Sequence, residues 1–395
     1  MSSKEGDMHL KVTSRKKPGF LERLSDTAGG VVAGIALFTF SFYVLFTNEG
    51  RALKTAASLD EGLSLVVSLQ DINSVDRQND GHLVHLSGPL NTPQPLFDPN
   101  YRISISAVKL KRQVEMYQWV EYDESREYEE NGEVKTETKY SYNTEWRPEV
   151  INSRNFDKEI GHTNPSAMAV ESVTVVSPDV SVGSFHLSTG LIDKVDNFKK
   201  LHLGSLGIWD PFLTIDDDYF YHTANPKRPE VGDVRVSFFY AGLSGQNINL
   251  GHPDLVTVIA QQRGEQLVSY KTKVGDTLEI LYQEALSAME VFEREHGFNS
   301  MKTWALRMAG WMMMFLGVSL MTRIFHTLVD WLPIVRNLVD LGLKLFAASV
   351  ATSLSLLTIA TGWLFYRPVW AIAIAALAAL PIIIAKSKAP QKKNM

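Results

Sequence analysis

The chain has one long apolar run near its start, then a long polar stretch, and then further apolar runs that fill its last quarter. The first run, residues 29–46, contains no charged residue. A helix needs roughly 20 apolar residues to cross the hydrocarbon core of a bilayer, so this run predicts a transmembrane helix over 29–47. We interpret it as an uncleaved signal anchor rather than a cleaved signal peptide, because no small-x-small cleavage pattern follows it.

Three more apolar runs follow the polar stretch, and each is long enough for a crossing. They predict transmembrane helices over 303–323, 345–366 and 369–385. Arg307 lies inside the first of these runs but close to its end, where a long cationic side chain reaches the headgroups. Four crossings are therefore expected.

Basic residues flank the outermost runs, in a tail over residues 1–28 and in a second tail over 386–395. The excess of Lys and Arg predicts that both tails stay on the cytosolic or nucleoplasmic side. With four crossings, the polar stretch over 48–302 then becomes a lumenal, perinuclear domain. The chain has no cysteine, so this domain needs a hydrophobic core of its own instead of disulfides.

The polar stretch is mostly patterned with period two, which predicts strands. Two such segments flank Asn131-Gly132, a turn signal that indicates a long antiparallel hairpin. Residues 276–295 predict a helix that runs into the second crossing. The fold class expected is a multi-pass α-helical membrane protein with four transmembrane helices and a large β-rich α+β lumenal domain. A short echo between 84–90 and 185–191 favours two similar β subdomains, with one mixed sheet as the alternative.

Motifs for catalysis or metal binding do not stand out. His82 and His85 are three apart, which in a strand points the rings to opposite faces. The acidic run 216–218 lacks the glycine and distal glutamate of a calcium loop. We therefore predict no enzyme activity, no cofactor and no metal site.

Residues 324–344 are amphipathic and predict a helix that lies on the cytosolic membrane interface. Pro333 fits its first turn. The polar side of this interfacial helix is expected to carry Asp330, Arg336, Asp340 and Lys344.

The third predicted crossing is rich in small and hydroxyl side chains. Two pairs have the small-x-x-x-small spacing that lets helices approach closely, and they predict contacts for helix packing or oligomer formation: Ser349 with Ser353, and Ala351 with Ser355. The alternative is a pore or polar interface, to which Arg307 and Thr352 would contribute.

Several long stretches resemble one known family. They include VEMYQWVEYDESREY over 114–128, PEVGDVRVSFFYAGLSG over 229–245 and GWLFYRPVWA over 362–371. Together with similar stretches elsewhere along the chain, they identify it as resembling the transmembrane protein 43 (LUMA) family over essentially its full length.

The resemblance implies a scaffold of the inner nuclear membrane and endoplasmic reticulum that helps maintain the nuclear envelope. It implies emerin, lamins and SUN-domain proteins as partners, assembly into homo-oligomers in the membrane, and a role in innate immune and NF-κB signalling. Membrane lipids are expected partners, and direct nucleic-acid binding is not expected. A channel, or a modulator of channel or gap-junction conductance, is the alternative function.

Overall fold

The computed structural model describes residues 8–16, 20–131, 133–206, 214–223, 225–245, 250–328 and 333–376. The chain divides into two compact units. A β-rich unit comprises residues 1–17, 65–271 and 277–291, and a helical unit comprises residues 18–64, 272–276 and 292–395. Each unit is described by itself below.

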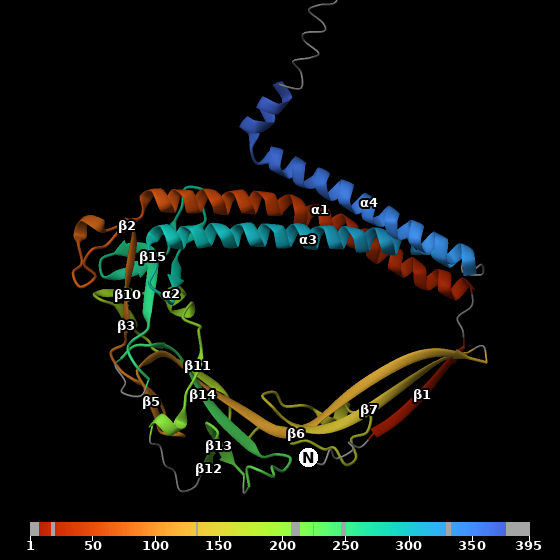
Figure 1. Ribbon diagram of the computed structural model, residues 1–395, viewed down its shortest axis with the longest axis horizontal. Helices are drawn as coiled ribbons and strands as arrows, with labels where there is room; N and C mark the ends of the chain where they lie inside the picture. The colour runs from red at the N-terminus through yellow and green to blue at the C-terminus, as the bar shows by residue number, and fades with distance from the viewer. Residues whose placement is uncertain are drawn as a thin grey trace, which may run out of the picture. The chain divides into compact units, whose positions relative to one another are not determined.

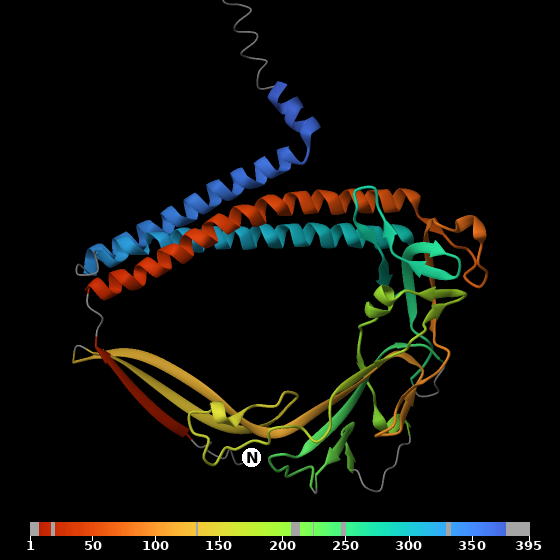
Figure 2. The same ribbon diagram turned by 180° about the vertical axis from the view of Figure 1, so that it is seen from behind.

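Three long helices form the helical unit: α1 (Phe20–Leu65), α3 (Ala288–Leu328) and α4 (Pro333–Phe365). They lie side by side in Figures 1 and 2. All three are long and apolar enough to cross a membrane, over Thr27–Leu65, Ala288–Phe325 and Val339–Phe365. The first three predicted crossings therefore fall on helices.

A fourth crossing is not shown. Residues 368–376 are helical, and the rest of the predicted crossing over 369–385 lies outside the described residues, as does the tail over 386–395. The chain turns at Arg367 and Pro368, because a proline opens the new helix and disfavours helical backbone in the residue before it.

Residues 324–344 do not form a separate helix, which corrects the prediction. The range is divided between the end of α3 at Leu328 and the start of α4 at Pro333. Pro333 begins a helix as expected, but helix-forming residues continue without a break past Lys344, so the amphipathic turns and the third crossing are one helix.

The larger sheet of the β-rich unit has eight strands in the order β1-β7-β6-β14-β13-β12, with β8 paired to β6 and β11 to β14. Its centre is the hairpin of β6 (Ala107–Glu130) and β7 (Glu133–Arg147), joined through Asn131 in the left-handed region at φ 55°. The predicted hairpin is confirmed. Figures 1 and 2 show it as a long bent ribbon that carries β1 on its edge.

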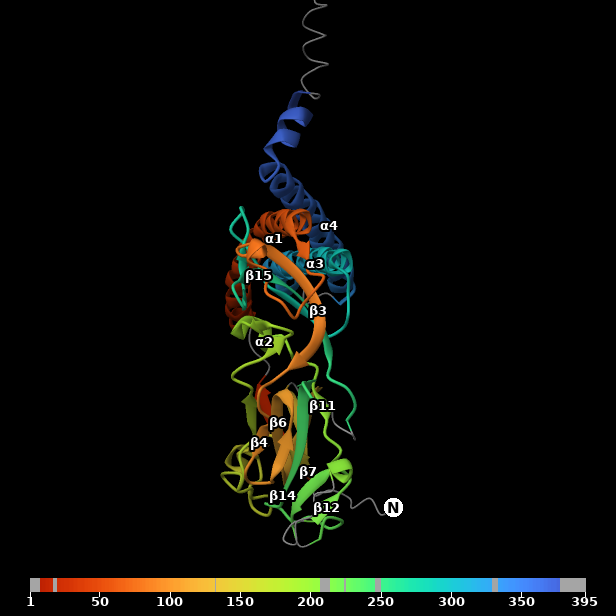
Figure 3. The same ribbon diagram turned by 90° about the vertical axis from the view of Figure 1, so that its left-hand side faces the viewer.

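The second sheet has seven strands in the order β19-β15-β16-β10-β9-β3-β2, and β15 also pairs with β3. Figure 3 shows β3 and β15 of this sheet above β6 and β14 of the first. The echo at 84–90 lies in β3, and the echo at 185–191 lies in β10 and α2. Because β3 and β10 are strands of the same seven-stranded sheet, the two stretches do not mark the starts of two similar subdomains.

The other elements are short. Their bounds are β1 (Met8–Lys16), β2 (Val67–Ser68), β3 (Leu83–Asn91), β4 (Leu96–Asp98), β5 (Ile103–Ile105), β8 (Val173–Val176), β9 (Ser181–Val182), β10 (Phe185–Leu187), α2 (Thr189–Asp193), β11 (Lys199–Lys200), β12 (Thr214–Asp216), β13 (Tyr219–His222), β14 (Val234–Leu243), β15 (Leu255–Arg263), β16 (Gln266–Val268), β17 (Tyr270–Lys271), β18 (Thr277–Leu278) and β19 (Ile280–Tyr282).

The predicted helix over 276–295 is wrong in its first half. Residues 277–282 form β18 and β19, and α3 begins only at Ala288. Pairing with β15 stabilises the strand conformation of Ile280–Tyr282, which forms an edge of the seven-stranded sheet and packs its side chains against that sheet.

Residues 8–16, inside the predicted basic tail, form β1 and pair antiparallel with β7 from Met8↔Ser141 to Lys16↔Glu133. A strand on β7 lies on the same side of a membrane as β7. A crossing by α1 would place the two on opposite sides, so one chain cannot have both arrangements at the same time. Whether the tails face the cytosol stays a prediction.

Candidate functional site

The three helices of the helical unit meet along a seam of small residues. Gly34 of α1 faces Gly317 of α3 so closely that a Cβ on Gly317 would lie 2.8 Å from the backbone nitrogen of Phe38. Further along, Leu45 of α1, Met314 of α3 and Ala351 of α4 are fully buried together. Close backbone approach of this kind gives van der Waals contact that long side chains would prevent.

An ion pair joins α1 to α3 at one end of this seam. Arg307 donates from Nε and an Nη to the two carboxylate oxygens of Glu49, both at 2.8 Å. The carboxylate side chain is 5% exposed and the arginine 20%. A bidentate pair fixes both the distance and the rotation of the two helices, because the planar guanidinium matches the carboxylate.

A network of polar side chains next to the ion pair also joins α1 to α3. Arg51 donates to the side-chain oxygens of Asn48, Asn299 and Thr303, each at 3.0 Å. Asn48 in turn donates to the backbone carbonyl of Thr303 at 3.0 Å. Most buried polar atoms of α1 and α3 at this level thus pair with one another, and the exception is the Nε of Arg51, which has no partner among the described residues.

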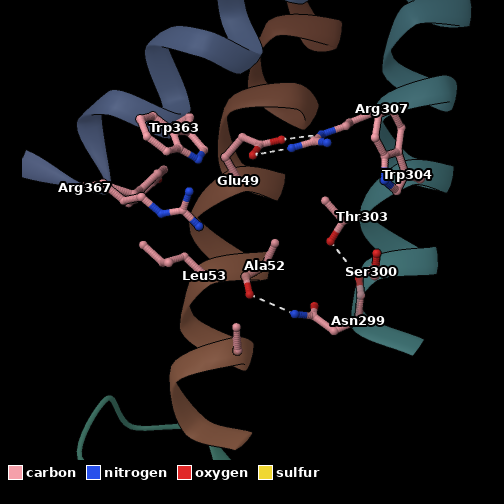
Figure 4. Close-up of a pocket in the computed structure, with 12 residues that line it drawn as sticks. Glu49, Ala52, Leu53, Asn299, Ser300, Thr303, Trp304, Arg307, Trp363 and Arg367 are labelled. Carbon is pink, nitrogen blue, oxygen red and sulfur yellow. Dashed lines mark hydrogen bonds and ion pairs between the residues drawn. The ribbon is translucent and has the colours of Figure 1, made fainter. Parts of the chain in front are cut away.

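A cavity of about 250 Å³ opens beside the ion pair, where α1, α3 and the end of α4 come together. Figure 4 shows Trp304 and Arg307 on one wall and Trp363 and Arg367 on the other, with Glu49 between them. The guanidinium of Arg367 lies 4.7 Å from the ring centre of Trp363, and that of Arg307 lies 4.8 Å from the ring centre of Trp304. Both contacts are cation–π interactions.

The predicted small-residue contacts divide into two faces of α4. Ala351 and Ser355 are buried in the seam, and the Ser355 hydroxyl lies 3.5 Å from the sulfur of Met314. Ser349 and Ser353 are exposed on the outer surface of the unit. Within one chain, therefore, one of the two predicted pairs packs against neighbouring helices, and the other is open to contact with a second molecule.

The predicted polar pair has partners in the seam. Arg307 is bound to Glu49, as described, and Thr352 accepts a hydrogen bond of 3.1 Å from the indole nitrogen of Trp311. The structure does not bring Arg307 and Thr352 together in a contact. Both side chains serve to connect helices.

Of the residues predicted for an interfacial helix, Lys344 and Asp340 form the expected i,i+4 ion pair at 2.7 Å in the first turns of α4. Asp330 lies outside the described residues, and the side chain of Arg336 is not described. Their placement at a membrane surface stays a prediction.

Sequence reasoning missed Glu49, Asn48 and Asn299 as members of the site. A signal was present, because Thr47-Asn48-Glu49-Gly50-Arg51 follows an apolar run directly, inside what proves to be one helix. A carboxylate at the end of an apolar run needs a cationic partner, and Arg307 lies at the start of the second apolar run. Among the described residues, no group of three or more His, Asp or Glu is arranged to hold a metal ion.

Comparison with known proteins shows which family the chain belongs to. The family model described as "Transmembrane protein 43" matches residues 116–368. Transmembrane protein 43 of Mus musculus is 63% identical over 98% of this chain and 96% of its own length, and that of Homo sapiens is 62% identical over the same shares.

A more distant relative extends the match. The transmembrane protein 43 homolog of Drosophila melanogaster is 33% identical over 85% of this chain and 88% of its own length. No solved structure matches. The similarity covers nearly the whole chain, and the chain is therefore a membrane protein that belongs to the transmembrane protein 43 family.

Proposed function

We propose that this protein is a membrane scaffold of the inner nuclear membrane and endoplasmic reticulum, which organises protein complexes and helps maintain the nuclear envelope. In this proposal it retains emerin and contacts lamins and SUN-domain proteins, assembles with copies of itself, and has a role in innate immune and NF-κB signalling. Family membership supports the membrane part of the proposal. The location and the partners rest on the resemblance stated above.

The observation that carries the scaffold proposal is the way in which the helices use their polar groups. Glu49 binds Arg307, and Trp311 binds Thr352. The hydroxyls of Thr322 and Thr358 donate to backbone carbonyls in their own helices. Polar side chains consumed by helix contacts support a packed anchor more than a water-lined path.

The β-rich unit supplies the second part that a scaffold needs, a folded surface attached to the membrane. It has two large buried hydrophobic clusters of its own. Its main part, residues 65–291, is connected to the helical unit at both ends, through residues 64 and 292. The distal part of β6, residues 121–129, is exposed and rich in carboxylates, which suits the docking of a basic partner segment.

Proximity labelling tests location and partners together. A labelling enzyme is fused to the N-terminus in one cell line and inserted into a loop of the β-rich unit in another. The scaffold proposal expects emerin and lamins to be enriched over a resident endoplasmic reticulum protein by at least one fusion. Equal labelling of nuclear-envelope and unrelated membrane proteins by both fusions would count against it.

An ion channel, or a modulator of conductance, is the second candidate, and one observation favours it. Ser349, Thr352 and Ser353 are exposed on α4, so an assembly of several chains would bring these hydroxyls together. Purified protein reconstituted in planar bilayers separates the two functions. Reproducible unitary currents that Ser353→Leu abolishes would support the channel, whereas silent bilayers containing correctly assembled protein would support the scaffold.

A further inference from the structure

The cavity beside Glu49 lies at the same end of all three apolar runs. Glu49 follows the first run, Trp304 begins the second and Arg367 follows the third. From Trp304 to Thr322, α3 rises about 27 Å at 1.5 Å per residue, close to the roughly 30 Å thickness of a hydrocarbon core. The cavity therefore lies at the level of the lipid headgroups.

The aromatic residues around the cavity agree with this level. Trp304 is 61% exposed and Phe365 is 68% exposed on the outside of the helical unit, where lipid would cover them. Trp363 and Tyr366 line the cavity itself. Tryptophan and tyrosine gather at membrane boundaries, because the ring is apolar and its N–H or O–H needs water or a headgroup.

The charges around the cavity do not balance. Glu49 is neutralised by Arg307, and Lys54 further along α1 is paired with Asp276 at 2.9 Å. Arg51 is held by neutral oxygens, and its buried Nε has no hydrogen-bond partner in the described part of the chain. Arg367 contacts the Trp363 ring and forms no ion pair with a described residue. Among the described residues, therefore, neither Arg367, which lines the cavity, nor Arg51, which does not, forms an ion pair with a carboxylate.

We propose that this cavity binds the phosphate of an anionic phospholipid headgroup, held by the Arg367 guanidinium between Trp363 and Trp304. Arg367 presents a planar fork of donors that matches a phosphate oxyanion. Ser300, which also lines the cavity, supplies a further polar group for the glycerol or the headgroup. The volume of about 250 Å³ admits a phosphate with a small substituent. This proposal is independent of the scaffold function.

Native mass spectrometry of the purified full chain in detergent tests the site. Phosphatidic acid is titrated into the wild type, Arg367→Gln and Arg367→Lys, and phosphatidylcholine serves as the zwitterionic lipid. Losing a charge-assisted contact should weaken phosphatidic acid binding by about tenfold or more in Arg367→Gln, and Arg367→Lys should restore part of it. Phosphatidylcholine binding should be weaker and unaffected by the substitution.

The matched control is Lys302→Gln, which removes an exposed cation at the same level of α3 without touching the cavity. Equal phosphatidic acid binding by Arg367→Gln and Lys302→Gln would overturn the site. Inorganic phosphate at millimolar concentration should not displace the lipid, and full displacement would overturn its assignment to a lipid. A thermal unfolding curve of Arg367→Gln that matches the wild type shows that the loss comes from binding rather than folding.

Discussion

The buried residues of the β-rich unit differ from those of the helix seam in the helical unit. The buried clusters of the β-rich unit contain large groups such as Phe185, Phe220 and Phe238, each fully buried. The buried seam of the helical unit contains Leu45, Met314 and Ala351, and glycines bring the backbones together. Many large apolar side chains of the helices are exposed, including Leu356 at 62% and Phe365 at 68% exposure.

The solvent explains this difference. In water, burying a large apolar side chain is favourable because it removes apolar surface from contact with water. In lipid the surroundings are as apolar as the side chain, so helices gain more from close backbone contact and from polar pairs. Large apolar side chains such as Leu356 and Phe365 can therefore stay on the outer surface of the helices, where lipid would cover them.

Both units nevertheless contain an arginine–carboxylate pair. In the β-rich unit Arg112 binds Asp98 at 2.8 Å, with the two side chains 10% and 4% exposed. Arg112 also donates to the backbone carbonyl of Glu171 and lies over the ring of Tyr101. Burial raises the pKa of the Tyr101 hydroxyl to about 12, and this hydroxyl is hydrogen-bonded to Nε2 of His222 at 2.8 Å. Each pair joins two elements, α1 to α3 in the helical unit and β4 to β6 in the β-rich unit.

The largest effect is expected from Phe238→Ala, which breaks the aromatic core of the β-rich unit. Truncating a fully buried phenylalanine costs about 3–5 kcal/mol. Amide hydrogen exchange of the full chain in detergent should show faster exchange across β6 and β14, with little change along α1 and α3. Leu356→Ala, at an exposed position of α4, is the control. If Phe238→Ala and Leu356→Ala lowered exchange protection to a similar extent, the two units would not differ in how much they depend on buried large side chains.

A smaller effect is expected from Glu49→Gln, which keeps the shape but removes the charge opposite Arg307. Losing hydrogen bonds to a charged group costs about 1.5–3 kcal/mol, and the partial exposure of Arg307 moves the value toward the lower limit. Exchange should accelerate where α1 meets α3 while the sheets keep their protection. Glu293→Gln removes an exposed carboxylate from α3 and should leave exchange unchanged. Unchanged exchange in Glu49→Gln would show that the pair does not hold the helices.

Gly317→Ala should loosen the helical seam by about 1–2 kcal/mol, because the added Cβ would lie 2.8 Å from the backbone nitrogen of Phe38 and 2.9 Å from the carbonyl oxygen of Gly34. Gly297→Ala, on the same helix with nothing within 4 Å, is the matched control and should be neutral or slightly stabilising. The readout is the thermal unfolding of α1 and α3, followed by circular dichroism. If both glycine variants behave alike, close contact is not what joins the helices.

The smallest change in stability is expected at β1, whose side chains are almost all exposed. Since the natural chain has no cysteine, Thr13→Cys with Thr136→Cys can form only the bond that the Thr13↔Thr136 register predicts. Oxidation of isolated membranes should give an intrachain disulfide, read as faster migration on a non-reducing gel. Thr13→Cys with Thr144→Cys, which is opposite Trp119, should not react.

Failure of the first cysteine pair has a specific meaning. The single variants Thr13→Cys and Thr136→Cys can each be labelled by an impermeant maleimide applied to one side of the membrane at a time. If the two variants were labelled from opposite sides, α1 would separate β1 from β7. The predicted cytosolic N-terminal tail would then be correct, and the pairing of β1 with β7 would not exist in the membrane-inserted protein.

Local patterns predicted the elements whose signals lie within one segment. The apolar runs predicted the helices at 29–46, 304–321 and 345–365, and alternation with an Asn-Gly turn predicted the hairpin of β6 and β7. The strands at 277–282 were missed, because their β conformation depends on pairing with other segments, β18 with β17 and β19 with β15. The start of a helix at Pro333 was predicted, but its continuation past Lys344 into the third crossing was missed, because the change from amphipathic to apolar turns does not mark a helix end.

The candidate site in the helices was also predicted only in part, because a pattern within one segment does not show which segments meet. Small residues in the third run indicated close packing, but only the fold shows that Ala351 and Ser355 face the seam while Ser349 and Ser353 face outward. Arg307 was noticed as an unusual charge in an apolar run. Its partner was not identified, because Glu49 is 258 residues away in the chain.

The sequence by itself determined that three helices are long and apolar enough to span a membrane, that the region between the first two is β-rich, and which family the chain belongs to. Hydrophobic period, run length and residue identity are local properties of the chain. Only the tertiary structure decided which polar residues meet. The Glu49–Arg307 pair, the Arg51 network and the cavity lined by Arg367 each join residues from separate helices, and their contacts depend on how closely glycines allow those helices to approach.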